Sequence, residues 1–540
     1  MSAYIPPVSD MMFALYDVLG FTHDDIDRET SESILDEAAK LASGVLAPLN
    51  KSGDVQGARL RDGVVKTADG FKDAYKTYCD GGWNAVPFDP EYDGQGLPWA
   101  LAFPIQEMWQ GANMSFGLCP LLNQGAVEAI ISHGSDVQKD YYLPKLISGE
   151  WTGTMNITEA QAGSDLGLIR SKAEPQEGGD YRITGQKIFI TYGDHDMAEN
   201  IIHLVLARTP NAPEDVHGIS MFIVPKFLED GTRNTVNCIG LEHKLGIHAS
   251  PTCTMDFDSA VGYLVGEDGR GLKYMFTMMN NARLSVGLQG VAIAERAMQR
   301  ANTFAKERKQ GKAIGGEERV NISEHPDVKR MMMDMHAHVT AGRLMTYSAA
   351  IELDKASSGD KAARMRADFL TPIVKSWCTD MASHVTSTGI QVHGGMGFIE
   401  ETGAAQYYRD ARILSIYEGT NGIQASDLSF RKVLRDDGHV AHVFLGELSG
   451  LIPDEIVDHL KRSTDKLLTL GEKGDLNEIA WNATPYLKAF GYAYGGAMLA
   501  QASRVNSEFT GGAKTTIKDI NDFYTRNILP IGLAHATITL

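Results

Sequence analysis

The composition of the chain changes at residues 151–158, which read WTGTMNIT. This run favours a β-strand, and similar β-prone runs follow at residues 181–184, 187–191, 201–206 and 219–224. Gly, Asn, Asp and Pro separate the runs, and no long helical pattern lies between them. Short strands with this spacing are typical of an antiparallel barrel or sandwich. They argue against a nucleotide-binding sheet in which strands and helices alternate.

Helical patterns lie on both sides of this β-rich segment. Apolar residues recur at helical spacing in residues 30–49, before it, and again from Leu284 onward, after it. Pro326 is expected to begin a helix that ends near Leu353, because proline is favoured at the first helical position. A further helix is expected at residues 362–388. The layout is therefore helical, then β, then helical again.

A break at residues 436–438, Asp-Asp-Gly, separates a last helical segment of about 100 residues. We therefore predict an α+β multidomain fold with four parts. These are an N-terminal helical domain at residues 1–150, a middle antiparallel β-barrel or sandwich at 151–270, a helical bundle at 271–435 and an extra helical domain at 436–540.

Length and charge exclude some classes of function. The chain has 540 residues and a net charge of −19, which argues against general binding to nucleic acids or anionic membranes, since both need a basic surface. The longest uncharged run, residues 108–127, contains Pro120 and several amides, which favours a buried pair of helices over a membrane span. Five cysteines, and no Lys or Arg before Arg28, indicate a cytoplasmic protein without a signal peptide.

One set of side chains has the composition of a zinc site: Cys238, His243, His248 and Cys253. They recur every five residues. This spacing places successive residues on opposite faces of a strand and rotates them by about 140° on a helix. We therefore expect no metal site, and assign these side chains to the strands and turns of the β-domain.

The best candidate for a catalytic group is Glu418, in the stretch 417–424 that reads YEGTNGIQ. An aromatic ring at Tyr417 can exclude water from one side of the carboxylate, and Gly419 lets the backbone approach a ligand closely. Loss of water makes a carboxylate a stronger base. The structural alternative is a loop glutamate before a helix N-terminus.

Three other segments could bind a ligand that has a planar ring and phosphates. Thr158 and Ser164 flank a loop whose hydroxyl and backbone N–H groups could bind a planar polar ring and a phosphate. Phe189 and Thr191 share one face of a strand, so one could pack against a ring while the other bonds to it. The basic run at residues 306–312 suits a pyrophosphate. Each segment also has a structural alternative. The loop at Thr158 and Ser164 could end in a helix cap, Phe189 and Thr191 could reflect ordinary strand alternation, and the basic run could be cations at a helix C-terminus.

Together these segments resemble the acyl-CoA dehydrogenase family, whose fold comprises an N-terminal helical domain, a middle β-domain and a C-terminal four-helix bundle. The matching motifs follow the family order: residues 90–96, 158–165 and 188–191, Arg283, Arg308, and residues 391–397 and 417–424. The extra C-terminal helices, together with residues 150–155 and 278–283, are similar to a larger bacterial branch of the family.

The resemblance implies FAD as the cofactor and an acyl-CoA as the substrate. Glu418 would remove the α-proton of the thioester, and its backbone N–H would stabilise the carbonyl oxygen. The residues implied at FAD are Thr158, Ser164, Phe189, Thr191, Arg308, Gln391, Gly395 and Thr420. Those implied near the substrate are Ser164, Asn280, Arg283, Tyr417 and Gly419. Arg308 would reach the FAD of a second subunit, which implies a homodimer, or a tetramer built from dimers.

Several positions depart from the common family pattern. Ala160-Gln161 stands where Pro-Gly is usual, and Phe189 stands where tryptophan is usual. Asn280 replaces an aspartate frequent in shorter-chain members, and Gly422 replaces a glutamine. These departures concern contacts with FAD and CoA, not the reaction.

The resemblance leaves the acyl chain open. The bacterial branch implies 3-methylmercaptopropionyl-CoA, oxidised to 3-methylthioacryloyl-CoA in dimethylsulfoniopropionate catabolism and sulfur metabolism, while a medium- or long-chain fatty acyl-CoA is the alternative. Electron-transferring flavoprotein is the expected acceptor, whereas an oxidase would use O2. An alkylation-response flavoprotein that binds DNA is an alternative of another class, and it would need a basic C-terminal domain. The segment after Asp436 is instead rich in acidic residues.

Overall fold

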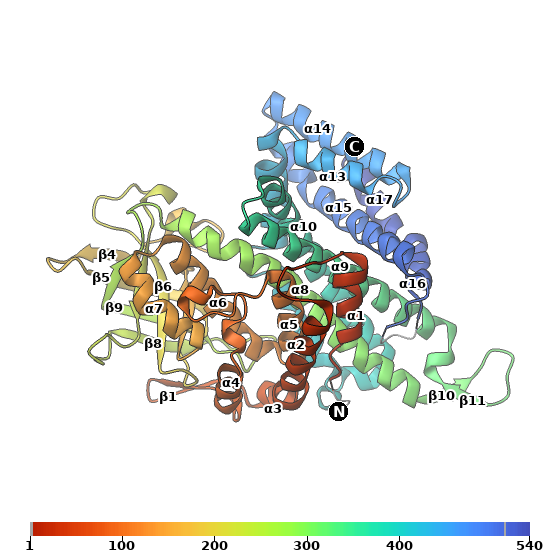
Figure 1. The fold of residues 1–540 in the computed structure, drawn as a ribbon, viewed down its shortest axis with the longest axis horizontal. Coiled ribbons are helices and arrows are strands. Elements are labelled where there is room, and N and C mark those ends of the chain that lie inside the picture. Colours follow the sequence, from red (N-terminus) through yellow and green to blue (C-terminus); the bar gives the residue numbers. More distant parts are fainter. Residues whose placement is uncertain (1–3, 512–514) are drawn as a thin grey trace. The chain divides into compact units, whose positions relative to one another are not determined.

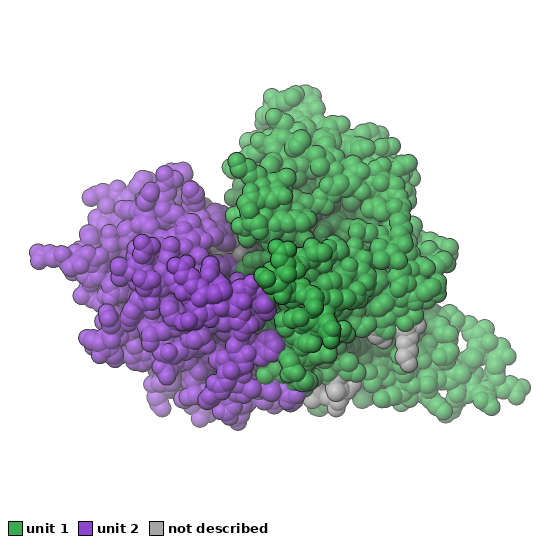
Figure 2. Space-filling model, in the orientation of Figure 1, with its two compact units in different colours: residues 1–43, 98–112, 283–540 green, residues 44–97, 113–282 purple. Residues whose placement is uncertain are grey.

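The computed structural model describes residues 4–511 and 515–540 (Figure 1). The chain forms two compact units, which Figure 2 colours green and purple. Unit 1 comprises residues 1–43, 98–112 and 283–540, and unit 2 comprises residues 44–97 and 113–282. The predicted α+β multidomain fold is confirmed. The two compact units do not coincide with the four expected segments. The predicted boundaries of those segments, at residues 150, 270 and 435, stay a prediction.

Unit 2 begins with helices and a short hairpin. They are α3 (Pro48–Gln56), β1 (Arg59–Arg61), β2 (Val64–Lys66), α4 (Phe71–Asp80), α6 (Met114–His133) and α7 (Asp136–Ser148). Helix α6 is long and apolar enough to cross a membrane by length and composition, but 89% of its most apolar window is buried inside the protein. The uncharged run at 108–127 thus falls on buried helices, as predicted.

The sheet of unit 2 has seven strands. They are β3 (Trp151–Asn156), β4 (Lys172–Pro175), β5 (Tyr181–Thr191), β6 (Asn200–Ala207), β7 (Ser220–Pro225), β8 (Val236–Leu241) and β9 (Thr252–Leu264). Their order is β3-β6-β7-β9-β5-β4, with β8 also paired to β9. All pairs are antiparallel except β3 with β6, which run parallel. The five predicted runs correspond to β3, β5, β6 and β7, because residues 181–191 form one continuous strand.

Strand β6 shows how the sheet is buried on both faces. Ile202, Leu204 and Leu206 pack into a core shared with α6 and α7, whereas Val205 and Ala207 pack into a second core with β5 and β9. Alternate side chains of a strand point to opposite faces, so an unbroken apolar strand needs protein on both sides. The continuous apolar sequence of β6 is explained in this way.

Unit 1 is built on long helices. They are α2 (Arg28–Leu41), α5 (Trp99–Ala112), α8 (Gly271–Glu307, divided between the units after Ala282), α9 (Pro326–Ser357) and α10 (Lys361–His393). The predictions of Pro326 as a helix start and of a helix over 362–388 are confirmed. A hairpin of β10 (Lys309–Lys312) and β11 (Arg319–Asn321) follows α8.

Further helices complete unit 1. They include α1 (Val8–Met12), α11 (Ala404–Ala411), α12 (Asn421–Ser426), α13 (His439–Leu448), α14 (Asp454–Lys473), α15 (Leu476–Val505), α16 (Ile517–Phe523) and α17 (Leu529–Ile538). Helix α15 packs against α9 and α10 as well as against α14 and α17 (Figure 1). The extra C-terminal helices therefore share one hydrophobic core with the bundle.

A buried ionic cluster joins three helices of unit 1. Arg343 on α9 donates to Glu107 on α5 at 2.6 Å and to Glu295 on α8 at 2.8 Å. The Tyr347 hydroxyl donates to the second oxygen of Glu107 at 2.6 Å. One guanidinium thus stands between two buried carboxylates, and these raise its pKa against the opposing effect of burial.

Replacing Arg343 by methionine should strongly destabilise unit 1. The change leaves two buried carboxylates without a cation, which costs about 3–5 kcal/mol in comparable buried pairs. The free energy of unfolding in urea measures it. Arg330→Met, which breaks an exposed pair with Asp327, is the control and should cost less than about 1 kcal/mol. Equal losses in the two variants would contradict a stabilising role for the cluster.

Candidate functional site

Glu418 lies in a strained turn. The turn lies between the 3-10 helix η10 (Arg412–Ser415) and α12, whose first turn Thr420 caps by accepting the N–H of Ile423 at 3.3 Å. Glu418 has φ 55° and Gly419 has φ 86°, so two consecutive residues are left-handed. This conformation is unfavourable for glutamate. At Gly419 an added Cβ would lie 2.9 Å from Gln424 Nε2, so a larger residue would displace this side chain as well as strain the backbone.

Donors from three helices bind the carbonyl oxygens of this turn. Arg283 on α8 donates from Nε to the Glu418 oxygen at 3.3 Å. Lys375 on α10 donates from Nζ to the Gly419 oxygen at 2.9 Å. Gln424 on α12 donates to both oxygens, at 3.4 and 3.2 Å. A strained backbone persists when its surroundings fix it, and these four bonds do so here.

The surroundings of Glu418 favour its protonated form. Although the side chain keeps part of its surface open to solvent, desolvation by the surrounding protein raises the pKa of the Glu418 carboxyl. The cations of Arg283 and Lys375 oppose this shift without cancelling it. A carboxylate with a raised pKa is a stronger base than an ordinary surface glutamate, so the site can accept a proton from a weak carbon acid.

The residues beside Glu418 are anchored in the helices. The Tyr417 hydroxyl donates to Gln289 Oε1 on α8, and Gln289 in turn donates to Gln110 on α5 at 3.1 Å. Arg283 pairs with the buried Asp427 at 3.3 Å. The structure thus brings Arg283, Tyr417, Glu418 and Gly419 together, with Thr420 at the start of the next helix.

In unit 2 the predicted residues Thr158, Phe189 and Thr191 lie on neighbouring segments. Ile188 N donates to the Thr158 oxygen at 2.9 Å, and the Thr154 hydroxyl donates to the Thr191 oxygen at 2.8 Å. Pairing of β5 with β9 is irregular between Lys187 and Ile190, and Phe189 within this bulge has φ 60°. Its ring is 59% exposed. An exposed aromatic residue on a strained backbone, with threonines on the same and the neighbouring segment, suits a planar polar ligand.

A buried ion pair fixes the loop that carries Ser164. Lys187 on β5 donates to Glu159 at 2.8 Å, and Glu159 also accepts the backbone N–H groups of Arg170 and Ser171 at 2.8 and 3.0 Å. Burial alone raises the pKa of Glu159, but Lys187 and these hydrogen bonds lower it to about 2. Ser164 itself is exposed. No sequence pattern connected two residues 28 positions apart, so sequence reasoning missed this pair.

The remaining predicted residues lie at helix ends of unit 1. Arg308 follows the end of α8, and the basic run 306–312 is divided between that helix end and β10. Gln391 lies in the last turn of α10, and Gly395 lies in the 3-10 helix η8 (Gly394–Phe398). All three are exposed. Asn280 belongs to α8, and its side chain lies outside the described part of the structure.

The cysteines and histidines with zinc-like spacing are distributed over strands and a turn. Cys238 lies on β8 opposite Met255 of β9, while Cys253 faces Leu241. His248 is paired with Asp54 at 3.0 Å. These positions agree with the assignment to strands and turns of the sheet domain.

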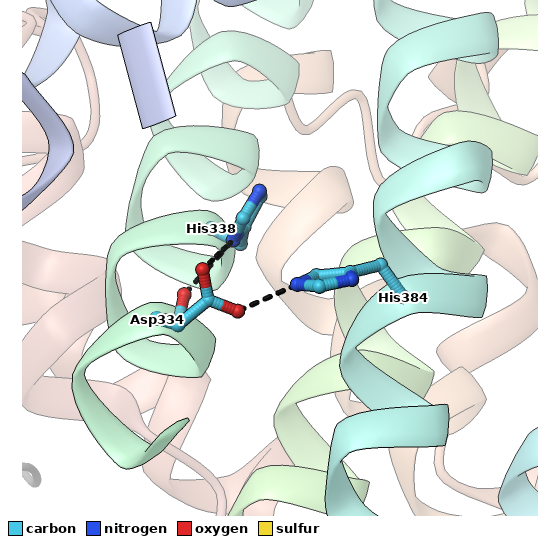
Figure 3. A group of neighbouring side chains, drawn as sticks. All are labelled: Asp334, His338 and His384. Atoms are coloured by element: carbon cyan, nitrogen blue, oxygen red, sulfur yellow. Dashed lines mark hydrogen bonds and ion pairs between the residues drawn. The ribbon is translucent and has the colours of Figure 1, made fainter. Parts of the chain in front are cut away.

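Another polar cluster, Asp334, His338 and His384, connects α9 and α10 (Figure 3). Its candidate ligand atoms lie within 4.8 Å of one another, and the residue types suit a metal ion. Asp334 Oδ2 lies 2.6 Å from His384 Nε2, and the Asp334 carbonyl lies 2.9 Å from His338 Nδ1. Burial lowers the pKa of His338 to about 4, which leaves it neutral at pH 7. The three residues are therefore joined by hydrogen bonds that connect α9 with α10.

Comparison with known proteins identifies the family. The acyl-CoA dehydrogenase N-terminal, middle and C-terminal domain models match residues 28–150, 154–260 and 269–432, and an acetyl-CoA dehydrogenase C-terminal-like model matches 453–539. The chain is 50% identical over 459 residues to 3-methylmercaptopropionyl-CoA dehydrogenase of Ruegeria pomeroyi, covering 82% of this chain and 78% of that one.

Two further proteins agree with this result. A butyryl-CoA dehydrogenase of Syntrophomonas wolfei is 38% identical, covering 79% of this chain and 73% of that one. The fold matches an acyl-CoA dehydrogenase of Bacillus anthracis complexed with FAD, with a TM-score of 0.78, 22% identity, and coverage of 98% of this chain and 91% of that one. The resemblance inferred from the motifs is confirmed: the chain belongs to the acyl-CoA dehydrogenase family, FAD-dependent oxidoreductases that act on a CH–CH bond of an acyl-CoA.

Proposed function

We propose that this chain oxidises 3-methylmercaptopropionyl-CoA to 3-methylthioacryloyl-CoA, with Glu418 as the base that removes the α-proton. The observation that carries the role of Glu418 is its desolvated carboxyl with a raised pKa, on a turn whose carbonyl oxygens are bound from three helices. The substrate assignment is supported by the 50% identical relative from Ruegeria pomeroyi.

The turn at Glu418 carries the two groups that removal of the α-proton needs, a base and a hydrogen-bond donor for the thioester oxygen. An α-proton beside a thioester is weakly acidic, so its removal needs a strong base and stabilisation of the negative charge on the thioester oxygen. Because the carbonyls of Glu418 and Gly419 are bound within the protein, the backbone that carries the Glu418 side chain is held in its left-handed turn. Its backbone N–H is the donor proposed for the thioester oxygen. Arg283, Tyr417 and Gly419 would keep both groups in place beside the substrate.

The residues proposed to hold FAD have suitable chemistry. Phe189 offers an exposed ring and Thr158 and Thr191 offer hydroxyls for a planar polar ring. Ser164, Arg308, Gln391, Gly395 and Thr420 are exposed positions proposed for its phosphates, ribityl chain and adenylate. Bound FAD supplies the acceptor for the hydride that leaves the β-carbon.

The partners belong to the same proposal. Electron-transferring flavoprotein is the acceptor that the family resemblance implies. A homodimer would cover apolar side chains that are strongly exposed beside the proposed adenylate and phosphate positions. Among them are Ile314, which is 85% exposed beyond β10, and Phe398, which is 84% exposed and follows Gly395. A cytoplasmic location and a place in dimethylsulfoniopropionate catabolism complete the proposal, while the butyryl-CoA relative keeps a fatty acyl-CoA as the alternative substrate.

Glu418→Gln should slow bleaching of the bound flavin by substrate at least about 10³-fold, because an amide cannot accept the α-proton. Anaerobic mixing with 3-methylmercaptopropionyl-CoA, followed by flavin absorbance, measures the rate. The ratio of FAD to protein should equal that of the unmodified enzyme, which excludes loss of cofactor as the cause. Bleaching at a rate near that of the unmodified enzyme would place the base elsewhere.

A panel of acyl-CoA substrates tests the acyl chain. We expect kcat/KM for 3-methylmercaptopropionyl-CoA to exceed the values for butyryl-CoA and octanoyl-CoA by about 10-fold or more, a ratio that corresponds to about 1.4 kcal/mol in transition-state binding. Equal values would remove the methylthio assignment and leave the oxidation of an acyl-CoA in place.

The pH dependence of kcat/KM should report the ionisation of Glu418. The base must be unprotonated, and desolvation raises its pKa, so activity should be lost as the pH falls through a value above the ordinary glutamate pKa of about 4.3. The charged groups that face the carboxyl are Arg283 and Lys375, and both limit the shift. An acid limb with a midpoint at or below about 4.3 would contradict a desolvated base.

A further inference from the structure

We infer that Lys375 is a positioning residue for this reaction: through Asn421 and the Gly419 carbonyl, its ammonium group fixes the strained turn and places a positive charge beside the Glu418 carboxylate. The inference rests on the proposed function, in which Glu418 is the base.

The position of Lys375 is unusual for a lysine. It lies in the middle of α10 with its side chain fully buried. Its Nζ donates to the Gly419 carbonyl at 2.9 Å and to Asn421 Oδ1 at 3.0 Å, and both acceptors are neutral. Lys187, the other fully buried lysine in the described part of the chain, donates directly to the Glu159 carboxylate. Lys375 is thus a buried cation bonded to neutral groups immediately after the proposed base.

Such an arrangement is costly unless the charge is useful. Burial lowers the pKa of Lys375 to about 7, and Glu418 and Asp380 partly offset this effect. A neutral donor could bind the same two oxygens without the desolvation of an ammonium group. Hydrogen bonding alone therefore does not account for a lysine, whereas a charge beside Glu418 does.

Asn421 orients the lysine relative to the turn. Its Nδ2 donates to the Asp380 carboxylate at 2.7 Å, and because a carboxylate only accepts hydrogen bonds, this bond fixes which end of the amide is the donor. The amide oxygen then faces Lys375, and the Thr379 hydroxyl lies 3.3 Å from the same oxygen. Asn421 is the first residue of α12, so these bonds connect the middle of α10 to the chain directly after the turn.

The charge of Lys375 complements that of Arg283. Both cations lower the pKa of Glu418 and so oppose the effect of desolvation. Arg283, however, is paired with Asp427, and Asp427 is also bound by Arg431. Lys375 has its hydrogen bonds to neutral oxygens, and among the residues that the structure describes it forms no direct ion pair. Asp380, the other acidic group that acts on it, is itself bonded to Asn421 and paired with Lys488 at 3.2 Å. Because its own pKa is about 7, Lys375 carries its full charge only below neutral pH, and in that range it is suited to keep Glu418 ionised.

The test compares Lys375→Met and Lys375→Gln with Lys432→Met. Lys432 is a partly buried lysine that contacts Asp368, also on α10, at 3.8 Å, and it is the matched control. Glutamine keeps a neutral donor at position 375, whereas methionine keeps neither donor nor charge. Both changes at Lys375 should shift the acid limb of the kcat/KM profile upward by about one pH unit or more, because a nearby cation is lost. They should lower kcat about 10-fold at pH 7 with KM and FAD content nearly unchanged, and the loss should be larger for methionine.

Several outcomes would overturn the inference. If the acid limb of the kcat/KM profile lies at the same pH in both Lys375 variants and in the control, the charge of Lys375 has no role. If kcat of the Lys375 variants is unchanged, Lys375 does not position the turn. If neither Lys375 variant binds FAD, Asn421→Ser tests the same connection while leaving the lysine in place. It should lower kcat and leave the acid limb unmoved, and an unchanged kcat would overturn the inference.

The Glu418 and Lys375 variants together distinguish an error about the base from an error about Lys375. If Glu418→Gln still bleaches the flavin, Glu418 is not the base and the proposed function fails. If Glu418→Gln is inactive and the Lys375 variants keep both kcat and the acid limb, only the role of Lys375 fails. A crystal structure of Lys375→Met adds a readout without turnover: we expect Glu418 to leave the left-handed region, or to show more than one conformation.

Discussion

The backbone conformation at Glu418 depends on hydrogen bonds to two backbone oxygens. Glu418 and Gly419 are both left-handed, a conformation that a free loop would leave. Arg283, Lys375 and Gln424 hold it, and each comes from a different helix. The proposed base is therefore carried by a turn that three helices of unit 1 hold, and one of these helices, α8, is also joined to α5 and α9 by the ionic cluster around Arg343.

Most of the buried charges described above are paired directly with an opposite charge, but Lys375 is bonded to neutral groups. The Glu159–Lys187 pair fixes a loop to a strand, and the Arg343 cluster joins three helices. In both, opposite charges are in direct contact, as buried charges usually must be. Near Glu418 positive and negative charges are not paired in this way, because Lys375 bonds to neutral oxygens. Imperfect neutralisation is unfavourable for stability, yet it keeps a desolvated carboxylate available as a base.

Much of the fold could be predicted from residue patterns. The predicted runs that became β3, β5, β6 and β7 have strong β propensity, and the burial of β6 and β7 on both faces follows from their largely apolar sequences. Strands β8 and β9 were not predicted. Asp256, Asp258 and Ser259 interrupt β9, and Ser259 is left-handed, so this strand is held by its neighbours β5, β7 and β8 more than by its own sequence.

For the candidate site, the sequence by itself determined which residues could act. The order of motifs pointed to a family, and within it to Glu418 as the base and to Phe189 with Thr158 and Thr191 for the flavin. Only the tertiary structure decided how these groups are held. The bulge at Phe189 and the left-handed turn at Glu418 are backbone states that no local preference favours, and the residues that maintain the turn, Arg283 and Lys375, lie 135 and 44 positions from the groups they bind. Contacts across such separations arise from packing, and a buried lysine bonded to neutral oxygens leaves no periodic signal in the chain. For that reason a candidate base could be proposed from sequence, whereas the charge proposed to keep it ionised could not.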